Sequence, residues 1–220
     1  MHATRRLRTA LKWSALGATG AVVVALARHS IQPVRATADE HNRPLPGDDL
    51  IANPVGEFTN AVTIHATPRA IWSWLAQMGA GRAGWYSYDA LDNSGQTSAT
   101  RINSELQHLE LGMVFPALPG ATDGFTLAAF DPGRSLVLDW KTPDGVRLVS
   151  WAFVLEPVSN RATRLIVRAR GGAGYQFFGL PSSVTKRIVP VVHAVHFIMQ
   201  RKQLLGIATR AGTLAAGGES

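Results

Sequence analysis

The spacing of hydrophobic residues changes several times along the chain, and the first change marks a strand followed by a helix. Residues 58–65 alternate, with Val62 and Ile64 on one face, which predicts a strand. Thr67 and Pro68 have the residue types of a helix N-cap and a first helical position. The helix that follows is expected to bury one apolar face, made of Ile71, Trp72, Leu75 and Met78.

A series of short strands and one long helix account for most of the remaining pattern. A short helix is expected at 88–93, and a polar turn near 103–105. Tight turns separate the later strands, so the sheet should be an antiparallel meander. These strands are expected at 112–117, 125–130, 134–141, 146–156 and 163–170. A terminal helix over 183–210 should pack through Val184, Ile188, Val191, Val195, Ile198 and Leu205.

This order of elements predicts an α+β fold in which a curved sheet wraps around the terminal helix. The space between such a sheet and its helix is a natural ligand cavity. Residues 28–57 are polar and proline-rich, and we interpret them as an extended linker. Arg164, Arg168 and Arg170 alternate along one strand, which predicts a solvated outer face.

The N-terminal segment carries most of the net charge of +7. Residues 1–35 hold six basic residues and no acidic one, and the basic cluster precedes an apolar run over 13–27. This layout is typical of a signal peptide or signal anchor, although the run is shorter than a full membrane span. We expect a membrane anchor with the domain outside the cytoplasm; export after cleavage, near Ala27 or Ala38, and a cytoplasmic location are the alternatives.

Composition removes several classes of function. The rest of the chain is nearly neutral, so no nucleic-acid partner is expected. The chain has no cysteine, and its histidines lack the spacing of a helical metal site, so neither a metal nor a cofactor is expected. His193 and His196 lie three residues apart on the terminal helix, where they could meet a ligand or simply be part of the packing.

Aromatic residues gather between 72 and 88, and they are the first candidates for the wall of a cavity. Trp72 lies on the apolar helix face and is expected in the core, whereas Trp74 should contact a lid or the linker. Arg82 could bind an anionic group or pair with Asp89 or Asp92. The full set of cavity candidates is Arg82, Trp85, Tyr86, Tyr88, His108, Trp140, Trp151, His196 and Met199; no catalytic residue is assigned.

Five segments carry a family resemblance that spans residues 36–210: 43–49, 61–64, 72–79, 81–89 and 199–207. They include the motifs RPLPGDD, WSWLAQMG and GRAGWYSYD. The chain resembles the SRPBCC superfamily, also called START-like or polyketide cyclase-like, and within it a bacterial subfamily of unassigned function. The resemblance implies a helix-grip domain over 36–212, between the N-terminal segment 1–35 and a flexible tail over 213–220.

The resemblance implies a hydrophobic cavity but no particular reaction, because the superfamily includes lipid carriers, receptors and cyclases. We expect a binding protein for a lipophilic small molecule, such as a lipid, an isoprenoid or a polyketide. One alternative is a cyclase or dehydratase, in which Arg82, Tyr86, His108 or His196 would meet in the cavity and move protons. Another is a structural envelope protein whose core has no cavity. The oligomeric state is left open.

Overall fold

A computed structural model of the protein describes residues 34–121, 123–173 and 182–217. The side chains of 182–193 and 214–217 are outside the description, although their backbone is helical. The apolar run over 13–27, which we expect to form an N-terminal helix, lies outside the described residues, so the anchor stays a prediction. Within the described residues, no helix is long and apolar enough to cross a membrane.

Six strands form one antiparallel sheet in the order β1-β6-β5-β4-β3-β2. The sheet is curved, and its register shifts within β3, near the end of β4 and near the end of β5. Such irregularities bend strands and increase their twist. The strands are β1 (Gly56–Ile64), β2 (Val114–Pro116), β3 (Gly124–Asp131), β4 (Ser135–Lys141), β5 (Arg147–Ser159) and β6 (Ala162–Gly171).

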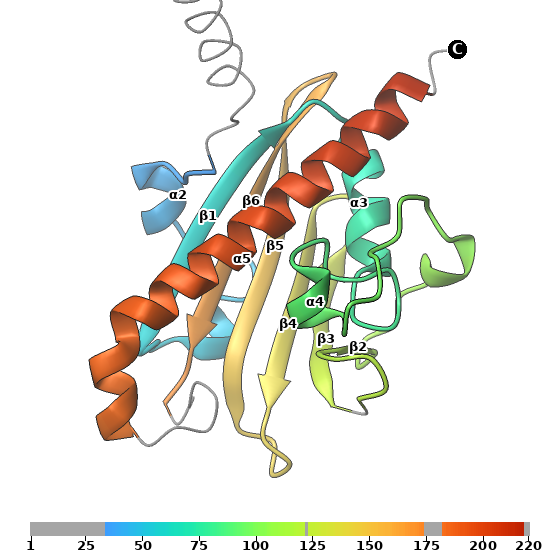
Figure 1. The fold of residues 1–220 in the computed structure, drawn as a ribbon. Coiled ribbons are helices and arrows are strands. Elements are labelled where there is room, and N and C mark those ends of the chain that lie inside the picture. The colour runs from blue at the N-terminus through green and yellow to red at the C-terminus, as the bar shows by residue number, and fades with distance from the viewer. Residues whose placement is uncertain (1–33, 122, 174–181, 218–220) are drawn as a thin grey trace, which may run out of the picture. The chain divides into compact units, whose positions relative to one another are not determined.

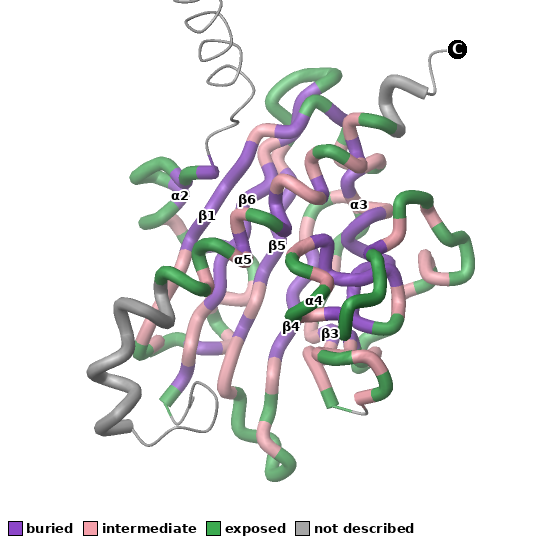
Figure 2. Tube along the Cα trace, in the orientation of Figure 1, coloured by how far each residue is buried: buried purple, intermediate pink, exposed green. Residues whose placement is uncertain are grey.

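The longest helix, α5 (Ser182–Gly217), crosses one face of this sheet, while α3 (Pro68–Gln77) and α4 (Asp89–Asp92) lie beside it (Figure 1). The remaining short helices are α2 (Ala38–Asn42), η1 (Asp49–Ile51) and η2 (Ser104–Leu106). Burial is concentrated where the strands face α5 and in the loop after α3 (Figure 2). A curved antiparallel sheet with a long C-terminal helix is the predicted helix-grip fold, which is thereby confirmed.

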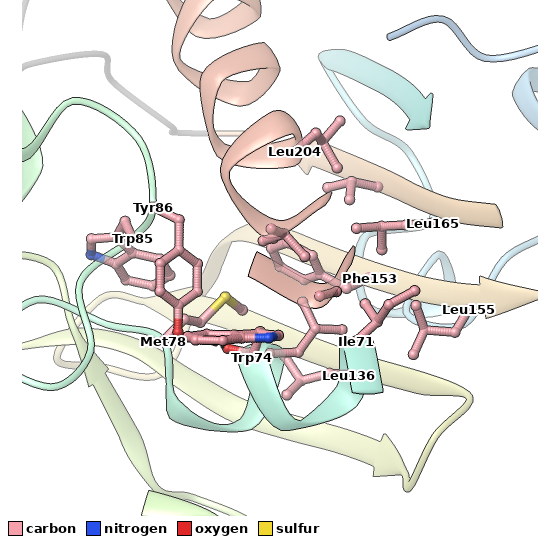
Figure 3. Close-up of a cluster of buried hydrophobic side chains, with 14 of the residues drawn as sticks. Ile71, Trp74, Met78, Trp85, Tyr86, Leu136, Phe153, Leu155, Leu165 and Leu204 are labelled. Carbon is pink, nitrogen blue, oxygen red and sulfur yellow. Dashed lines mark hydrogen bonds between the residues drawn. The ribbon is translucent and has the colours of Figure 1, made fainter. Parts of the chain in front are cut away.

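The start of α3 forms as expected, but its buried face is rotated. The Thr67 side chain accepts a hydrogen bond from the Ala70 amide, and Pro68 occupies the first turn. Trp74 is 1% exposed and packs in the core (Figure 3). Trp72 is half-buried and stacks on Phe130, with ring centroids 6.4 Å apart. The assignment of these two tryptophans was wrong because the core contacts positions i, i+3, i+4 and i+7 of the helix, and Trp72 lies at the edge of that stripe.

The predicted apolar stripe of α5 was only partly right where its side chains are described. Leu205 packs against the core, but Val195 and Ile198 are exposed, and the side chains of Val184, Ile188 and Val191 lie outside the described residues. The buried positions also follow helical spacing, but they include two amides: Gln200, Gln203, Leu204, Ile207 and Ala211. A search for apolar periodicity could not find this face because part of it is polar.

Residues 34–55 are folded against the outer face of the sheet, so their interpretation as an extended linker was wrong. Thr37 and Glu40 form a capping box at the start of α2, each side chain bonded to the other residue's amide. Ala36 and Leu45 pack with Ala61, Val154 and Ile166 in a small apolar cluster on this face.

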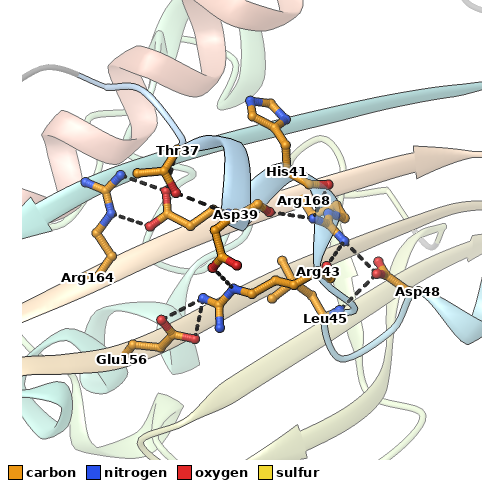
Figure 4. Close-up of polar contacts among 10 residues, drawn as sticks. Thr37, Asp39, His41, Arg43, Leu45, Asp48, Glu156, Arg164 and Arg168 are labelled. Atoms are coloured by element: carbon orange, nitrogen blue, oxygen red, sulfur yellow. Dashed lines mark hydrogen bonds and ion pairs between the residues drawn. The ribbon is translucent and has the colours of Figure 1, made fainter.

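The arginines of β6 are bound to this segment and are not a solvated face (Figure 4). Arg168 is 2% exposed and pairs with Asp48 at 2.6 Å; its guanidinium also donates to the carbonyls of Glu40, His41 and Arg43. Arg164 binds both carboxylate oxygens of Glu40, at 2.7 and 2.9 Å. Strand alternation correctly placed Arg164, Arg168 and Arg170 together on the outer face of the sheet. Only the tertiary structure shows that residues 34–55 cover this face.

Candidate ligand pocket

A pocket of about 450 Å³ lies between the sheet and α5. Strands β3 to β6 and α5 supply most of its lining, and Trp85, Ser87 and Asp92 add to it from the segment between α3 and the end of α4. Its lining is mainly apolar and aromatic, with a few polar groups. The lining residues are Trp85, Ser87, Asp92, Ala117, Phe125, Trp140, Leu148, Val149, Trp151, Ala169, His196, Met199, Gln200 and Gln203.

Four aromatic rings form one continuous wall of this pocket. Trp85 stacks on Trp151 with ring centroids 5.4 Å apart and planes at 28°. Phe125 packs against Trp151 at 5.0 Å and meets the ring of Trp140 edge-on at 5.3 Å. Aromatic faces at these separations offer a large, rigid contact area to a flat apolar molecule.

The register of the sheet explains why a space is left beside this wall. Trp151 on β5 lies opposite Ala169 on β6, and Val149 lies opposite Gly171. Large side chains on one strand therefore face small ones on the next strand. Two residues further along β5, Phe153 lies opposite Val167 on β6. Both side chains are buried, and they belong to the filled core. The change from small to larger partners along β6 marks where the pocket ends and the core begins.

The loop after α3 directs two consecutive aromatics to different places. Gly79 and Gly84 pair across a tight turn, and both have positive φ, which a side chain would strain. Tyr86 also has a positive φ, of 60°, so its ring diverges from that of Trp85. Trp85 lines the pocket, whereas the Tyr86 hydroxyl donates to the carbonyl of Trp74 at 3.0 Å within the core (Figure 3).

Hydrogen-bonded amides form the α5 side of the pocket. The Trp151 Nε1–H donates to Gln200 Oε1 at 3.3 Å, and Gln200 Nε2 donates to Gln203 Oε1 at 2.6 Å. Ser87 donates to the carbonyl of Met199 at 3.0 Å, which ties the segment before α4 to α5. The ring of His196, which also lines the pocket, lies 4.6 Å from that of Phe58.

Asp92 is the acidic group in the pocket lining. Burial raises its pKa to about 6, and the neighbouring Asp89 acts in the same direction, while Ser87 opposes the shift. Its Oδ1 is buried and has no hydrogen-bond partner among the described residues. Near neutral pH the carboxyl is therefore mostly ionised, and it places a negative charge beside the aromatic wall.

Five of the nine cavity candidates line this pocket: Trp85, Trp140, Trp151, His196 and Met199. Tyr86 belongs to the core, and Tyr88 is exposed at the start of α4. His108 is exposed and contacts Glu110 at 2.9 Å, away from the lining residues. The side chain of His193 lies outside the described residues. Whether the five lining residues contact a ligand stays a prediction.

Within the described part of the chain, Arg82 forms no ion pair with Asp89 or Asp92. Its guanidinium donates to the carbonyls of Met78 and Ala76 and lies over the Phe115 ring, 5.1 Å from the centroid. Burial lowers its pKa. The side chain therefore holds the end of α3 against β2, and it does not line the pocket.

Three polar lining residues were missed as cavity candidates by sequence reasoning. Gln200, Gln203 and Asp92 each lie on a helix, where an isolated polar residue is usually a surface residue. Ala169, the small residue opposite Trp151, could have been found only from the register of β5 and β6. No group of His, Asp and Glu that could hold a metal ion occurs within the described ranges.

No protein-family model matches the chain, and no curated protein is similar to it in sequence. Similar solved structures include a polyketide-cyclase-like protein of Corynebacterium glutamicum, with 15% identity over 69% of this chain and 88% of that one and a TM-score of 0.33. The Aha1 dimer of Colwellia psychrerythraea has 13% identity over 66% and 96%, with a TM-score of 0.32. The two-domain ARO/CYC protein BexL has 12% identity over 71% and 46%, with a TM-score of 0.33.

The class of the protein follows from its own strand order, terminal helix and pocket: it is a helix-grip protein with an aromatic-walled pocket.

Proposed function

We propose that the protein binds a lipophilic small molecule in the pocket between the sheet and α5. The observation that carries this proposal is the wall of four aromatic rings around a space of about 450 Å³. A ligand that loses about 200 Å² of apolar surface there gains roughly 5 kcal/mol before the costs of association. A lipid, isoprenoid or polyketide-like body fits such a lining.

The two alternative functions, a structural protein without a cavity and a proton-transfer enzyme, make different demands on the pocket. A structural protein with a filled core does not require such a pocket. A proton-transfer enzyme was expected to bring side chains from the set Arg82, Tyr86, His108 or His196 together in the cavity, and of these only His196 lines the pocket. The described geometry therefore favours binding over the cyclase arrangement that the sequence suggested.

Binding can be tested with the neutral dye N-phenylnaphthylamine, whose fluorescence rises in apolar sites. We expect saturable binding to the full-length protein, with energy transfer from the pocket tryptophans. Ala169→Phe should abolish binding, because the new ring would occupy the pocket from β6. Ala129→Phe, at an exposed position of β3, is the matched control. Equal dye binding by both variants would place the dye elsewhere and remove the support for this site.

We also propose that the N-terminal segment tethers the domain to a membrane. The support is its sequence, in which a basic cluster precedes an apolar run. Cleavage near Ala38, which would release the domain from such an anchor, is disfavoured by the structure. Ala36 packs on the sheet and Thr37 caps α2, so cleavage at that site would remove residues that belong to the folded domain. Fractionation of cells that express the full-length chain tests the tether, and recovery in the soluble fraction after lysis without detergent would contradict it.

A further inference from the structure

Three side chains in the pocket form a hydrogen-bond chain whose direction is fixed by its first member. An indole N–H can only donate, so the Trp151 ring requires an oxygen from its neighbour. Gln200 accordingly presents Oε1 to the indole at 3.3 Å and directs its NH₂ group to Gln203 Oε1 at 2.6 Å. The orientation of each amide therefore follows from the one before it.

The end of this chain is a donor group in the pocket lining. Gln203 accepts through Oε1, which leaves Nε2 and its two N–H groups at the free end. No described residue accepts a hydrogen bond from this nitrogen, and Gln203 lines the pocket, so the donor group is accessible from there. A donor that faces a mainly apolar pocket has few other acceptors there, so an oxygen atom of a bound molecule would be stabilised by its hydrogen bond.

The charge of the pocket indicates what kind of oxygen this is. Asp92 also lines the pocket, and its buried Oδ1 has no hydrogen-bond partner within the described part of the chain. Ionised Asp92 would repel a ligand carboxylate held in the same small, poorly solvated space. A neutral carbonyl oxygen accepts from the amide without this repulsion.

We propose that Gln203 determines the polar specificity of the pocket by donating a hydrogen bond to a neutral carbonyl oxygen on a flat, apolar ligand. This inference rests on the proposed binding function. The aromatic wall receives the flat body, and the Trp151–Gln200–Gln203 chain holds the donor in one orientation. Gln203 is thus a ligand-contacting residue, while Gln200 and Trp151 position its amide.

Three naphthalene derivatives of similar shape, with a β-acetyl, β-ethyl or β-carboxylate group, test the proposal. They separate the apolar contact, the hydrogen bond to a carbonyl oxygen and the repulsion of a carboxylate by Asp92. Each is measured by displacement of N-phenylnaphthylamine from the full-length protein. Acetylnaphthalene should bind about tenfold more tightly than ethylnaphthalene, because only the ketone can accept a hydrogen bond from the Gln203 amide. The naphthoate should bind more weakly than the ketone. In addition, a naphthyl ketone dye such as Prodan should show the emission shift of a hydrogen-bonded carbonyl when bound.

Gln203→Met keeps the length of the side chain and removes its donor. It should abolish the preference for the ketone over the ethyl compound and reverse the Prodan shift, while Gln96→Met, at an exposed loop position, should change neither. Equal affinities of the unaltered protein for the ketone and the ethyl compound would overturn the inference and leave the binding function intact. Failure of all probes to bind the unaltered protein would overturn both. These measurements decide the matter even if Gln203→Met does not fold.

Discussion

The ion pair between Glu40 and Arg164 should make the stability of the domain depend on pH, and Glu40→Gln tests this directly. Glu40 is 6% exposed, and its carboxylate accepts two hydrogen bonds from Arg164 and one from the Thr37 amide. The hydrogen bonds from Arg164 are the largest cause of a pKa lowered from 4.5 to about 2, and burial partly opposes them. Glutamine keeps one oxygen but removes the charge.

The expected magnitude follows from the two pKa values. A difference between 4.5 in the unfolded chain and about 2 in the folded one corresponds to up to about 3 kcal/mol, at about 1.36 kcal/mol for each pH unit. Because the folded-state pKa is lowered, this stabilisation is fully present above pH 4.5 and is lost as the pH falls toward 2. Glu40→Gln should therefore cost roughly 2–3 kcal/mol near neutral pH and almost nothing at the acid end of this range.

The assay is urea-induced unfolding at a series of pH values, followed by tryptophan fluorescence. The difference between the variant and the unaltered protein is compared with that for Glu105→Gln, whose side chain is exposed. Only the Glu40 difference should shrink as the pH falls. A Glu40 difference that is large but constant with pH would refute the electrostatic explanation, and would point to altered packing of residues 34–55.

Three further predictions concern helix packing, the outer face and the pocket. Gly206→Ala should destabilise the fold in urea unfolding despite the better helix propensity of alanine, because a Cβ there would overlap the Tyr86 carbonyl; Gly212→Ala has open space and should stabilise by about 0.5–1 kcal/mol. Arg168→Met should lower the free energy of unfolding by about 3 kcal/mol, since three backbone carbonyls lose their charged donor and Asp48 keeps only Arg170 and the Leu45 amide; a loss below about 1 kcal/mol would contradict this. Asp92→Asn should raise stability near neutral pH, because burial raises the folded-state pKa from 3.8 to about 6; the gain should vanish as the pH falls from about 6 to 3.8, and unfolding at the two ends of that range checks it.

The pocket was predictable in kind from the sequence but not in its residues. Alternation correctly placed Trp151 and Trp140 on strands, and the order of elements correctly suggested a space beneath the terminal helix. Tyr86 was misplaced because a positive φ in the middle of the loop rotates its ring into the core, and no pattern of hydrophobic residues encodes that rotation. Gln203 was missed because a buried amide looks like a surface residue until its partner is known.

The sequence by itself determined the helix-grip architecture, because strand alternation, helix caps and tight turns depend on residues close together in the chain. Only the tertiary structure decided which faces are covered. Arg168 became buried because residues 34–55, more than a hundred positions earlier, supply its acceptors. Likewise, the donor at Gln203 exists because Trp151 on β5 meets Gln200 on α5. Both outcomes depend on contacts between distant segments, which local patterns do not specify.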